Sequence, residues 1–327
     1  MTADELGAGA MEDAPCPVGC PRDDLRVLSG RDLLHGLPGE FSVVKCRSCG
    51  LMRTNPRPTV SAMRGYYPAT YGPHLATRVP TSDPDRGNAF ARFLRAVVRR
   101  IFDAKATILP EMPAGRMLEF GCASGAYLYQ MAAEGWKVEG IEVSQAAAAE
   151  VARLGFPIHS GSIGSAQPTL LPFDLIVGWM ALEHLHDPLA DLRRLYDWAQ
   201  PDCVLALSVP NAASFEFRLF ESKWYALQLP THLYHFTPQS LRVLLNAAGW
   251  TVERVHYQRT ISNVIGSLGY LLADRGYTRL ARRLVEAPES GGLWVYLAHP
   301  IAVLLSLFGQ TGRMTIWARK SGSTSGA

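Results

Sequence analysis

The sequence predicts an α/β fold with a parallel β-sheet and crossover helices. From Gly115 onward, short apolar segments that fit buried strands alternate with amphipathic segments of helical length. Near the start of this region, the strand-like segment Met117–Phe120 leads into a turn of small residues, and a helical segment opens at Gly125. A strand, a glycine-bearing turn and a helix in this order are how α/β folds hold a nucleotide-like ligand.

Seven short segments fit strands of this sheet: Arg116–Phe120, Val138–Glu142, Pro157–His159, Phe173–Trp179, Val204–Val209, Thr251–His256 and Arg313–Ala318. Four segments fit crossover helices: Gly125–Ala133, Gln145–Leu154, Pro188–Ala199 and Pro238–Ala248. The last helix has a strong start, because Thr237 offers a hydroxyl N-cap and Pro238 follows in the first turn. A further amphipathic helix is predicted at Asn88–Phe102.

The chemistry of the first turn indicates what kind of ligand it holds. The pattern is acid-x-Gly-x-x-x-Gly, from Glu119 through Gly121 to Gly125, and not the G-x-G-x-x-G of a dinucleotide site. A carboxylate inside the strand would repel a diphosphate and would suit a ligand with an ammonium or sulfonium cation. Glu142 ends the next strand, where its carboxylate can accept hydrogen bonds from both hydroxyls of a ribose. The alternative is an ordinary strand–turn–helix connection without a ligand.

The segment Leu118–Gly125, together with Glu142, resembles motif I and the ribose-binding acid of class I S-adenosylmethionine-dependent methyltransferases. The resemblance covers about residues 110–258 and the final strand, and it implies a Rossmann-like seven-stranded sheet. It departs from the family at Ala123, where glycine is usual. It also implies that adenine rests near Ser162 and Ile163. The implied cofactor-binding residues are Glu119, Gly121, Ala123, Gly125, Glu142, Ser162, Ile163, Trp179 and Met180.

Four cysteines form two pairs, Cys16 with Cys20 and Cys46 with Cys49. Two thiolate pairs on short turns can close a tetrahedral Zn²⁺ site, and four protein ligands leave no open position, so the site would be structural. The first pair has one more intervening residue than the commonest C-x-x-C spacing. A disulfide among unrelated cysteines is the alternative. The polar, acidic segment 1–14 lacks an apolar signal core, so we expect a reducing, cytoplasmic setting in which zinc is favoured.

The composition fits a globular protein, with 327 residues, 48% hydrophobic and 19% charged. We expect a disordered N-terminus (1–14), a zinc ribbon (15–55), a linker and helical lid (56–109), an S-adenosylmethionine-binding core (110–260), an apolar helical insertion (261–311), the final core strand (312–320) and a disordered tail (321–327). The Asn-Pro-Arg-Pro sequence at 55–58 is interpreted as the linker.

The insertion is longer than the hairpin that usually joins the last two strands of this family. Its first part, 275–286, is basic and amphipathic, and its second part, 292–309, has no charged residue. We expect a buried helical hairpin that packs on the core or on a second subunit, as in a homodimer. Peripheral contact of 292–309 with a membrane surface is the alternative.

Methyl transfer is a direct displacement, so the enzyme must align the reacting groups and often remove a proton. Three histidines are candidate bases. His184 follows Glu183 just after the fourth strand, in a pair that resembles a motif of small-molecule methyltransferases. Some quinone-pathway relatives add an acid three residues earlier and bind a divalent metal there; Met180 occupies that position, so no catalytic metal is expected. His232 and His235 lie in a segment that resembles one in zinc-ribbon methyltransferases of nucleotide sugars. Each histidine could instead make only structural hydrogen bonds.

These features predict an S-adenosylmethionine-dependent methyltransferase acting on a small hydroxylated acceptor, a sugar or natural-product intermediate, at oxygen more readily than at carbon. The alternative is a tRNA or rRNA methyltransferase that uses the zinc ribbon to grip nucleic acid. The net charge of +3 is small for a nucleic-acid partner, and none is expected. A non-catalytic binding module or a nicotinamide-dependent enzyme is a third hypothesis, disfavoured by the turn pattern.

Overall fold

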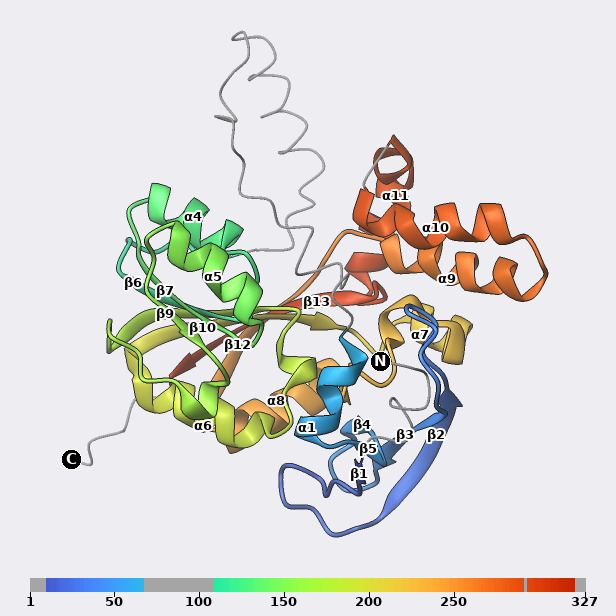
Figure 1. Ribbon diagram of the computed structural model, residues 1–327, viewed down its shortest axis with the longest axis horizontal. Helices are drawn as coiled ribbons and strands as arrows, with labels where there is room; N and C mark the ends of the chain where they lie inside the picture. The colour runs from blue at the N-terminus through green and yellow to red at the C-terminus, as the bar shows by residue number, and fades with distance from the viewer. Residues whose placement is uncertain (1–9, 68–108, 291–292, 321–327) are drawn as a thin grey trace, which may run out of the picture.

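The computed structural model describes residues 10–67, 109–290 and 293–320 (Figure 1). Its centre is a seven-stranded sheet in the order β12-β13-β10-β9-β6-β7-β8. The strands are β6 (Arg116–Phe120), β7 (Lys137–Glu142), β8 (Ile158–Ser160), β9 (Phe173–Trp179), β10 (Ala199–Pro210), β12 (Trp250–Tyr257) and β13 (Arg313–Lys320). Strand β13 runs antiparallel to both of its neighbours, and strands β6 to β10 are parallel. The predicted Rossmann-like seven-stranded sheet is confirmed.

Helices cover both faces of this sheet, as the alternating sequence pattern predicts. Figure 1 shows α4 (Ala126–Ala133) and α5 (Gln145–Arg153) on one face, with α6 (Pro188–Trp198) and α8 (Pro238–Ala247) on the other. Each face buries its own hydrophobic core, one around Leu118 and Phe236 and one around Met117 and Val177. The helix start at Thr237 is confirmed, because its hydroxyl accepts a hydrogen bond from the Ser240 amide at 3.1 Å.

The N-terminal region forms a second, four-stranded sheet in the order β11-β4-β3-β2. Its strands are β2 (Asp24–Gly30), β3 (Phe41–Cys46), β4 (Met52–Thr54) and β11 (Tyr234–His235). Strand β11 belongs to the segment that carries two of the candidate bases, so this sheet joins the cysteine-bearing region to the core. The short helices α1 (Val60–Met63) and η1 (Arg64–Tyr66) follow it.

Two expectations about this region are wrong. The segment 1–14 is not structureless throughout, because β1 (Met11–Glu12) pairs with β5 (Arg57–Pro58). The same pairing makes part of the predicted linker a strand. Arg57 is 8% exposed and binds Glu12 Oε1 at 2.7 Å, so a long-range ion pair orders a sequence that alone suggests a break. The predicted helix 88–102 and the tail 321–327 lie outside the described residues.

After β10 the chain forms α7 (Phe215–Phe220) and the one-turn helices η4 (Glu221–Lys223) and η5 (Tyr225–Leu227). The insertion forms α9 (Ser262–Asp274), α10 (Thr278–Ser290) and α11 (Leu293–Leu307). Helix α9 packs on η5, where Tyr225 and Tyr270 stack with ring centroids 5.8 Å apart. The expected burial of the apolar part on the core is wrong for four side chains that are more than half exposed: Ile301, Leu304, Leu307 and Phe308.

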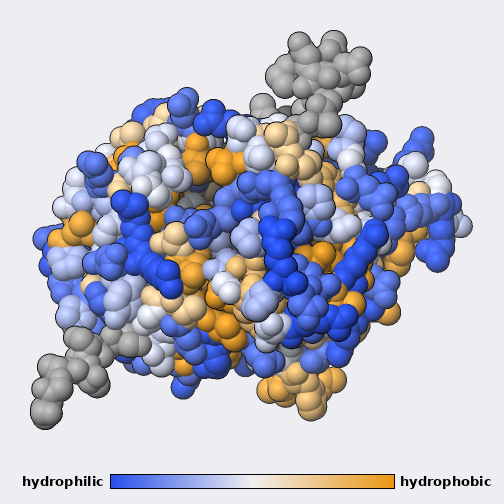
Figure 2. All heavy atoms as spheres, turned by 90° about the horizontal axis from the view of Figure 1, so that it is seen from below, coloured by the Kyte–Doolittle hydropathy of each residue, from blue (hydrophilic) through white to orange (hydrophobic). Residues whose placement is uncertain are grey.

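No helix within the described ranges has the length and apolar character needed to cross a membrane. Contact of 292–309 with a membrane surface, or with a second subunit, stays a prediction. On the face seen in Figure 2, hydrophilic and hydrophobic side chains are interspersed, and one group of hydrophobic side chains protrudes at the edge.

Candidate functional site

The turn after β6 has a backbone that small residues make possible. Gly121, Ala123 and Gly125 have φ values of 67°, 47° and 80°. A β-carbon at Gly121 would lie 2.8 Å from the Ala181 β-carbon, and one at Gly125 would lie 2.9 Å from Val151 Cγ2. Glycine is therefore required at both ends of the turn. Ala123 adopts the same left-handed region with a side chain, at a cost in strain.

Glu142 organises this turn from the end of β7. Its carboxylate accepts hydrogen bonds from the amides of Ala123 and Ser144, both at 2.8 Å. The loop with Ser162 and Ile163 lies next to it, because the Gly161 amide donates to the Glu142 carbonyl at 2.8 Å. The structure thus brings together the predicted ribose-binding acid, the turn and the predicted adenine-binding loop.

Glu119 lies beneath the turn and is 3% exposed. Burial, and secondarily the charge of Glu142, raises the pKa of Glu119 well above its usual value. Its Oε2 atom has no hydrogen-bond partner among the described residues. A buried, unsatisfied carboxyl oxygen beside a bare turn is the environment that a cationic ligand would complete. The residues present therefore fit S-adenosylmethionine.

Trp179 ends β9 at the same edge of the sheet, and Met180 follows it directly. Trp179 packs edge-on against Tyr127 of α4, with ring centroids 5.4 Å apart, and its buried indole Nε1 has no partner among the described residues. Met180 has a φ of 54°, and its amide donates to the Ser208 carbonyl at 2.8 Å. Tyr127 was not predicted as a site residue, because nothing in the sequence marks this helical tyrosine.

Glu183, His184 and His232 form a second group, here called the histidine cluster. A carboxyl oxygen and one nitrogen from each imidazole all lie within 4.8 Å of one another. The two imidazole rings meet edge to face, with centroids 4.7 Å apart. Glu183 and His184 lie in η3 (Leu182–His184), directly after β9. The backbone of the two segments is joined by a hydrogen bond from the Leu233 amide to the Glu183 carbonyl at 2.8 Å.

Hydrogen bonds fix which nitrogen of His232 carries the proton. Nδ1 lies 2.9 Å from the Ala226 carbonyl oxygen, which can only accept, so Nδ1 donates. The Nε2 atom of the neutral ring then holds a lone pair. His232 is 2% exposed, and burial lowers its pKa well below the usual value. His184 Nδ1 similarly lies 2.9 Å from the Thr231 carbonyl and 2.9 Å from the Tyr67 hydroxyl.

Glu183 is fully buried, and neither of its carboxyl oxygens has a hydrogen-bond partner within the described part of the chain. Burial raises its pKa to about 8. The histidine cluster thus combines a neutral imidazole with a carboxyl group that ionises near neutral pH. A divalent cation could also be held by these three groups, since they offer two nitrogens and a carboxylate.

His235 lies apart from the histidine cluster, in β11. Its Nε2 atom is 3.2 Å from the Thr54 hydroxyl, and burial lowers its pKa to about 3. Thr54 in turn donates its hydroxyl to the His232 carbonyl at 2.8 Å. His235 therefore takes part in the contact between the N-terminal sheet and the segment that carries His232.

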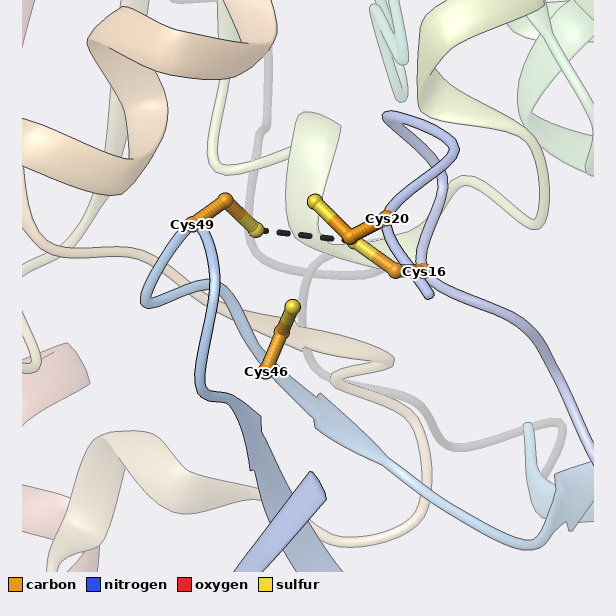
Figure 3. A group of neighbouring side chains, drawn as sticks. All are labelled: Cys16, Cys20, Cys46 and Cys49. Atoms are coloured by element: carbon orange, nitrogen blue, oxygen red, sulfur yellow. Dashed lines mark hydrogen bonds between the residues drawn. The ribbon is translucent and has the colours of Figure 1, made fainter. Parts of the chain in front are cut away.

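The four cysteines meet at one point, as Figure 3 shows. Cys16 and Cys20 come from the N-terminal loop, while Cys46 ends β3 and Cys49 lies in the turn before β4. Their sulfur atoms all lie within 4.8 Å, and Cys16 Sγ is 3.5 Å from Cys49 Sγ. Tetrahedral Zn²⁺ with Zn–S bonds of about 2.3 Å needs sulfurs at such separations. The structure forms no disulfide among the six cysteines, in disagreement with the disulfide alternative.

Comparison with known proteins agrees with this geometry. A family described as "Methyltransferase domain" matches residues 90–255, half of the chain. No curated protein matches the chain. An S-adenosylmethionine-dependent methyltransferase from Mesorhizobium loti is 15% identical, covering 67% of this chain and 99% of its own, with a TM-score of 0.45. Magnesium protoporphyrin IX methyltransferase from Synechocystis PCC 6803, solved with bound SAH, is 13% identical, covering 80% and 100%, with a TM-score of 0.46.

The sheet order and the glycine-bearing turn define an α/β enzyme domain that binds a nucleotide-like ligand. The match over half of the chain makes the assignment specific. The chain belongs to the S-adenosylmethionine-dependent methyltransferases.

Proposed function

We propose that this enzyme transfers a methyl group to a hydroxyl of a small hydroxylated acceptor, a sugar or a natural-product intermediate, with His232 as the general base. S-adenosylmethionine, when bound, supplies an activated methyl group with a neutral leaving group. The remaining task of the protein is to align the hydroxyl and accept its proton. The observation that carries the proposal is the hydrogen bond of His232 Nδ1 to the Ala226 carbonyl, 2.9 Å long.

That bond leaves the Nε2 lone pair of a neutral imidazole available for the proton of the acceptor. Because burial keeps His232 neutral, the base is in its active form at physiological pH. Positive charge develops on the ring as it takes the proton. In the molecules in which Glu183 is already ionised, its negative charge lies beside the ring. The buried carboxylate then stabilises the imidazolium. The same geometry would serve removal of a carbon-bound proton, so carbon methylation is the close variant.

The methyl donor would be held by the turn at Gly121–Gly125 and by two acids. Glu142 would bind the ribose, and Glu119 would face the cationic end of the donor. Trp179 and Tyr127 would exclude water from the methionine end. Ser162 and Ile163 would contact the adenine.

We further propose that the four cysteines bind structural Zn²⁺. The support is the convergence of four thiols within 4.8 Å on two turns of one small sheet. Zinc there would hold β3 and β4 in place and, through Thr54, the backbone of His232.

The proposal is tested by incubating the purified enzyme with a radiolabelled methyl donor and fractionated cell metabolites, and then comparing wild type with His232→Gln. We expect methyl transfer to hydroxylated small molecules, with turnover reduced by about 10²-fold or more in the variant. Affinity for S-adenosylhomocysteine, measured by calorimetry, should stay within about twofold, since His232 is outside the donor site. Label appearing only in RNA, or loss of donor binding in the variant, would contradict the proposal.

A further inference from the structure

A second buried polar group lies where α7, α9 and the start of β13 meet. Glu216 of α7 is fully buried, and Asn263 of α9 is 1% exposed. Trp224 Nε1 donates to Glu216 Oε2 at 3.5 Å, and Asn263 Nδ2 donates to the Gly312 carbonyl at 3.3 Å. A β-carbon at Gly312 would overlap Glu216 Oε2 and lie 2.6 Å from Asn263 Nδ2. Close packing therefore holds both side chains in fixed positions.

Each of these two side chains has one oxygen left over. Glu216 Oε1 and Asn263 Oδ1 are buried, and neither has a hydrogen-bond partner within the described ranges. Native proteins rarely leave such atoms unsatisfied, because burial without a partner costs free energy. The Gly312 amide, Trp224 and Asn263 already donate hydrogen bonds to the carboxyl group of Glu216. Glu216 Oε1 and Asn263 Oδ1 are left over as acceptors, so a group that completes them would bring donors.

The location indicates a ligand of the enzyme. Strand β13 is antiparallel to β10, and Arg313 pairs with Pro210. The start of β13 therefore lies at the carboxyl ends of the parallel strands, where ligands of α/β sheets bind. The charge of Arg313 acts on both this group and the histidine cluster, because it contributes a lowering of the pKa at Glu183, Glu216 and His232, against the larger effect of burial at the two acids.

We propose that Glu216 and Asn263 form a recognition subsite that binds two neighbouring hydroxyl or amino donors of the acceptor. This inference rests on the proposed function, because the same acceptor would present its reacting hydroxyl to His232. Two accepting oxygens select a ligand with donors, as in the vicinal hydroxyls of a sugar ring, over an apolar or a phosphorylated fragment. Asn263 is the second residue of the insertion helix α9, so the insertion would contribute to acceptor selection.

The test uses two probes, cis-cyclohexane-1,2-diol and cyclohexanol, with the full-length protein saturated with S-adenosylhomocysteine. Ligand-observed NMR titrations give the affinity ratio of diol to mono-alcohol. We expect wild type to prefer the diol by about fivefold or more, and this preference to fall to about one in Glu216→Gln and in Asn263→Leu. Two results would overturn the proposal: equal affinities of wild type for the diol and the mono-alcohol, or an unchanged affinity ratio in folded Glu216→Gln. Either result would mean that the acceptor does not bind Glu216 Oε1 and Asn263 Oδ1.

Matched variants separate recognition from folding. Glu139→Gln removes another buried carboxylate, whose oxygens accept from the Thr169 and Leu170 amides at 2.9 Å, and it should leave the ratio unchanged. Glu216→Gln preserves shape, so it remains informative if Asn263→Leu does not fold.

Kinetics with an identified acceptor separate this inference from the proposed function. Glu216→Gln should raise KM by about tenfold while kcat stays within about threefold, whereas His232→Gln should lower kcat. If Glu216→Gln and Asn263→Leu both turn over the acceptor with unchanged KM, the subsite is contradicted while the proposed function stands. A retained diol preference without turnover on any hydroxylated compound would contradict the proposed function and support the subsite.

Discussion

Single residues in this enzyme owe their chemistry to burial without full hydrogen bonding. Glu119, Glu183 and Glu216 are each 3% exposed or less, and each has at least one oxygen without a partner in the described part of the chain. Desolvation is the largest cause of the raised pKa of all three. Such groups destabilise the folded protein, and carboxyl groups with raised pKa values cluster at functional sites.

Glu183 gives a pH-dependent prediction. Its folded pKa is about 8, above the usual 4.5, so stability is fully present below about pH 4.5 and is lost as pH rises towards 8. This shift corresponds to roughly 5 kcal/mol at most. Glu183→Gln stays neutral, so the variant should gain stability relative to wild type as pH increases from 5.5 to 8.5. Urea unfolding at several pH values measures the difference, and a difference that does not change with pH would contradict the raised pKa.

Ala123 gives a second prediction at this scale. Its φ of 47° strains a residue with a β-carbon, and glycine relieves the strain. Ala123→Gly should therefore stabilise the protein by about 1 kcal/mol in urea unfolding, with donor affinity retained. The control is Ala149→Gly, at an exposed position within α5, which should cost about 1 kcal/mol. Destabilisation by Ala123→Gly would mean that the side chain makes a contact worth more than the strain.

At the scale of elements, the N-terminal sheet and the segment that carries His232 form one unit. Strand β11 pairs with β4, and the Thr54 amide also donates to the Leu233 carbonyl at 2.9 Å. The Leu233 amide donates to Glu183. A continuous series of hydrogen bonds thus runs from the cysteine-bearing sheet to both segments of the histidine cluster.

This connection predicts that zinc affects turnover without contacting substrate. Cys46→Ser should lose bound zinc, measured by mass spectrometry, and should lower kcat by about tenfold or more because His232 is held less firmly. Thr54→Val should lower kcat with zinc retained, since it removes only the hydroxyl, which contacts the His232 carbonyl and His235 Nε2. Donor affinity should be near wild type in both variants. Full activity in a zinc-free Cys46→Ser protein would disprove the coupling.

Elements with strong local signals could be predicted closely, and elements that depend on distant partners could not. Strands β6 and β9 match the predicted residues, and α6 differs by one residue. Their apolar runs and caps are local. Strands β5 and β11 were missed because Arg57 and His235 become ordered only through partners far along the chain, Glu12 and Thr54. Helix α9 lies in the insertion that was predicted to be helical, but its bounds were not predicted, because its glycines and serines obscure a helical pattern, although they allow close packing on Tyr225.

At the scale of the whole molecule, sequence reasoning predicted the residues that the structure gathers at the turn after β6, but it predicted only part of the histidine cluster and none of the Glu216–Asn263 group. Glu119, Glu142 and the turn follow from topology, because consecutive parallel strands end at one edge. The meeting of Glu183 with His232, or of Glu216 with Asn263, depends on how loops and the insertion pack over that edge. No local pattern encodes those contacts.

The charge distribution predicts that RNA is not the substrate. The net charge is +3, and four arginines of the N-terminal region are each paired with an acid: Arg22, Arg47, Arg53 and Arg57. Nucleic-acid binding depends on cations that are free to neutralise phosphates, and it weakens steeply with salt. Fluorescence anisotropy with labelled tRNA should therefore show no binding tighter than about 10 μM at 0.15 M salt.

The control is the charge-reversal variant Asp13→Lys with Asp23→Lys, which frees Arg22 and Arg47 and should bind tRNA more tightly. Tight, salt-dependent binding by wild type, together with methyl transfer to tRNA, would favour the nucleic-acid alternative over a small acceptor.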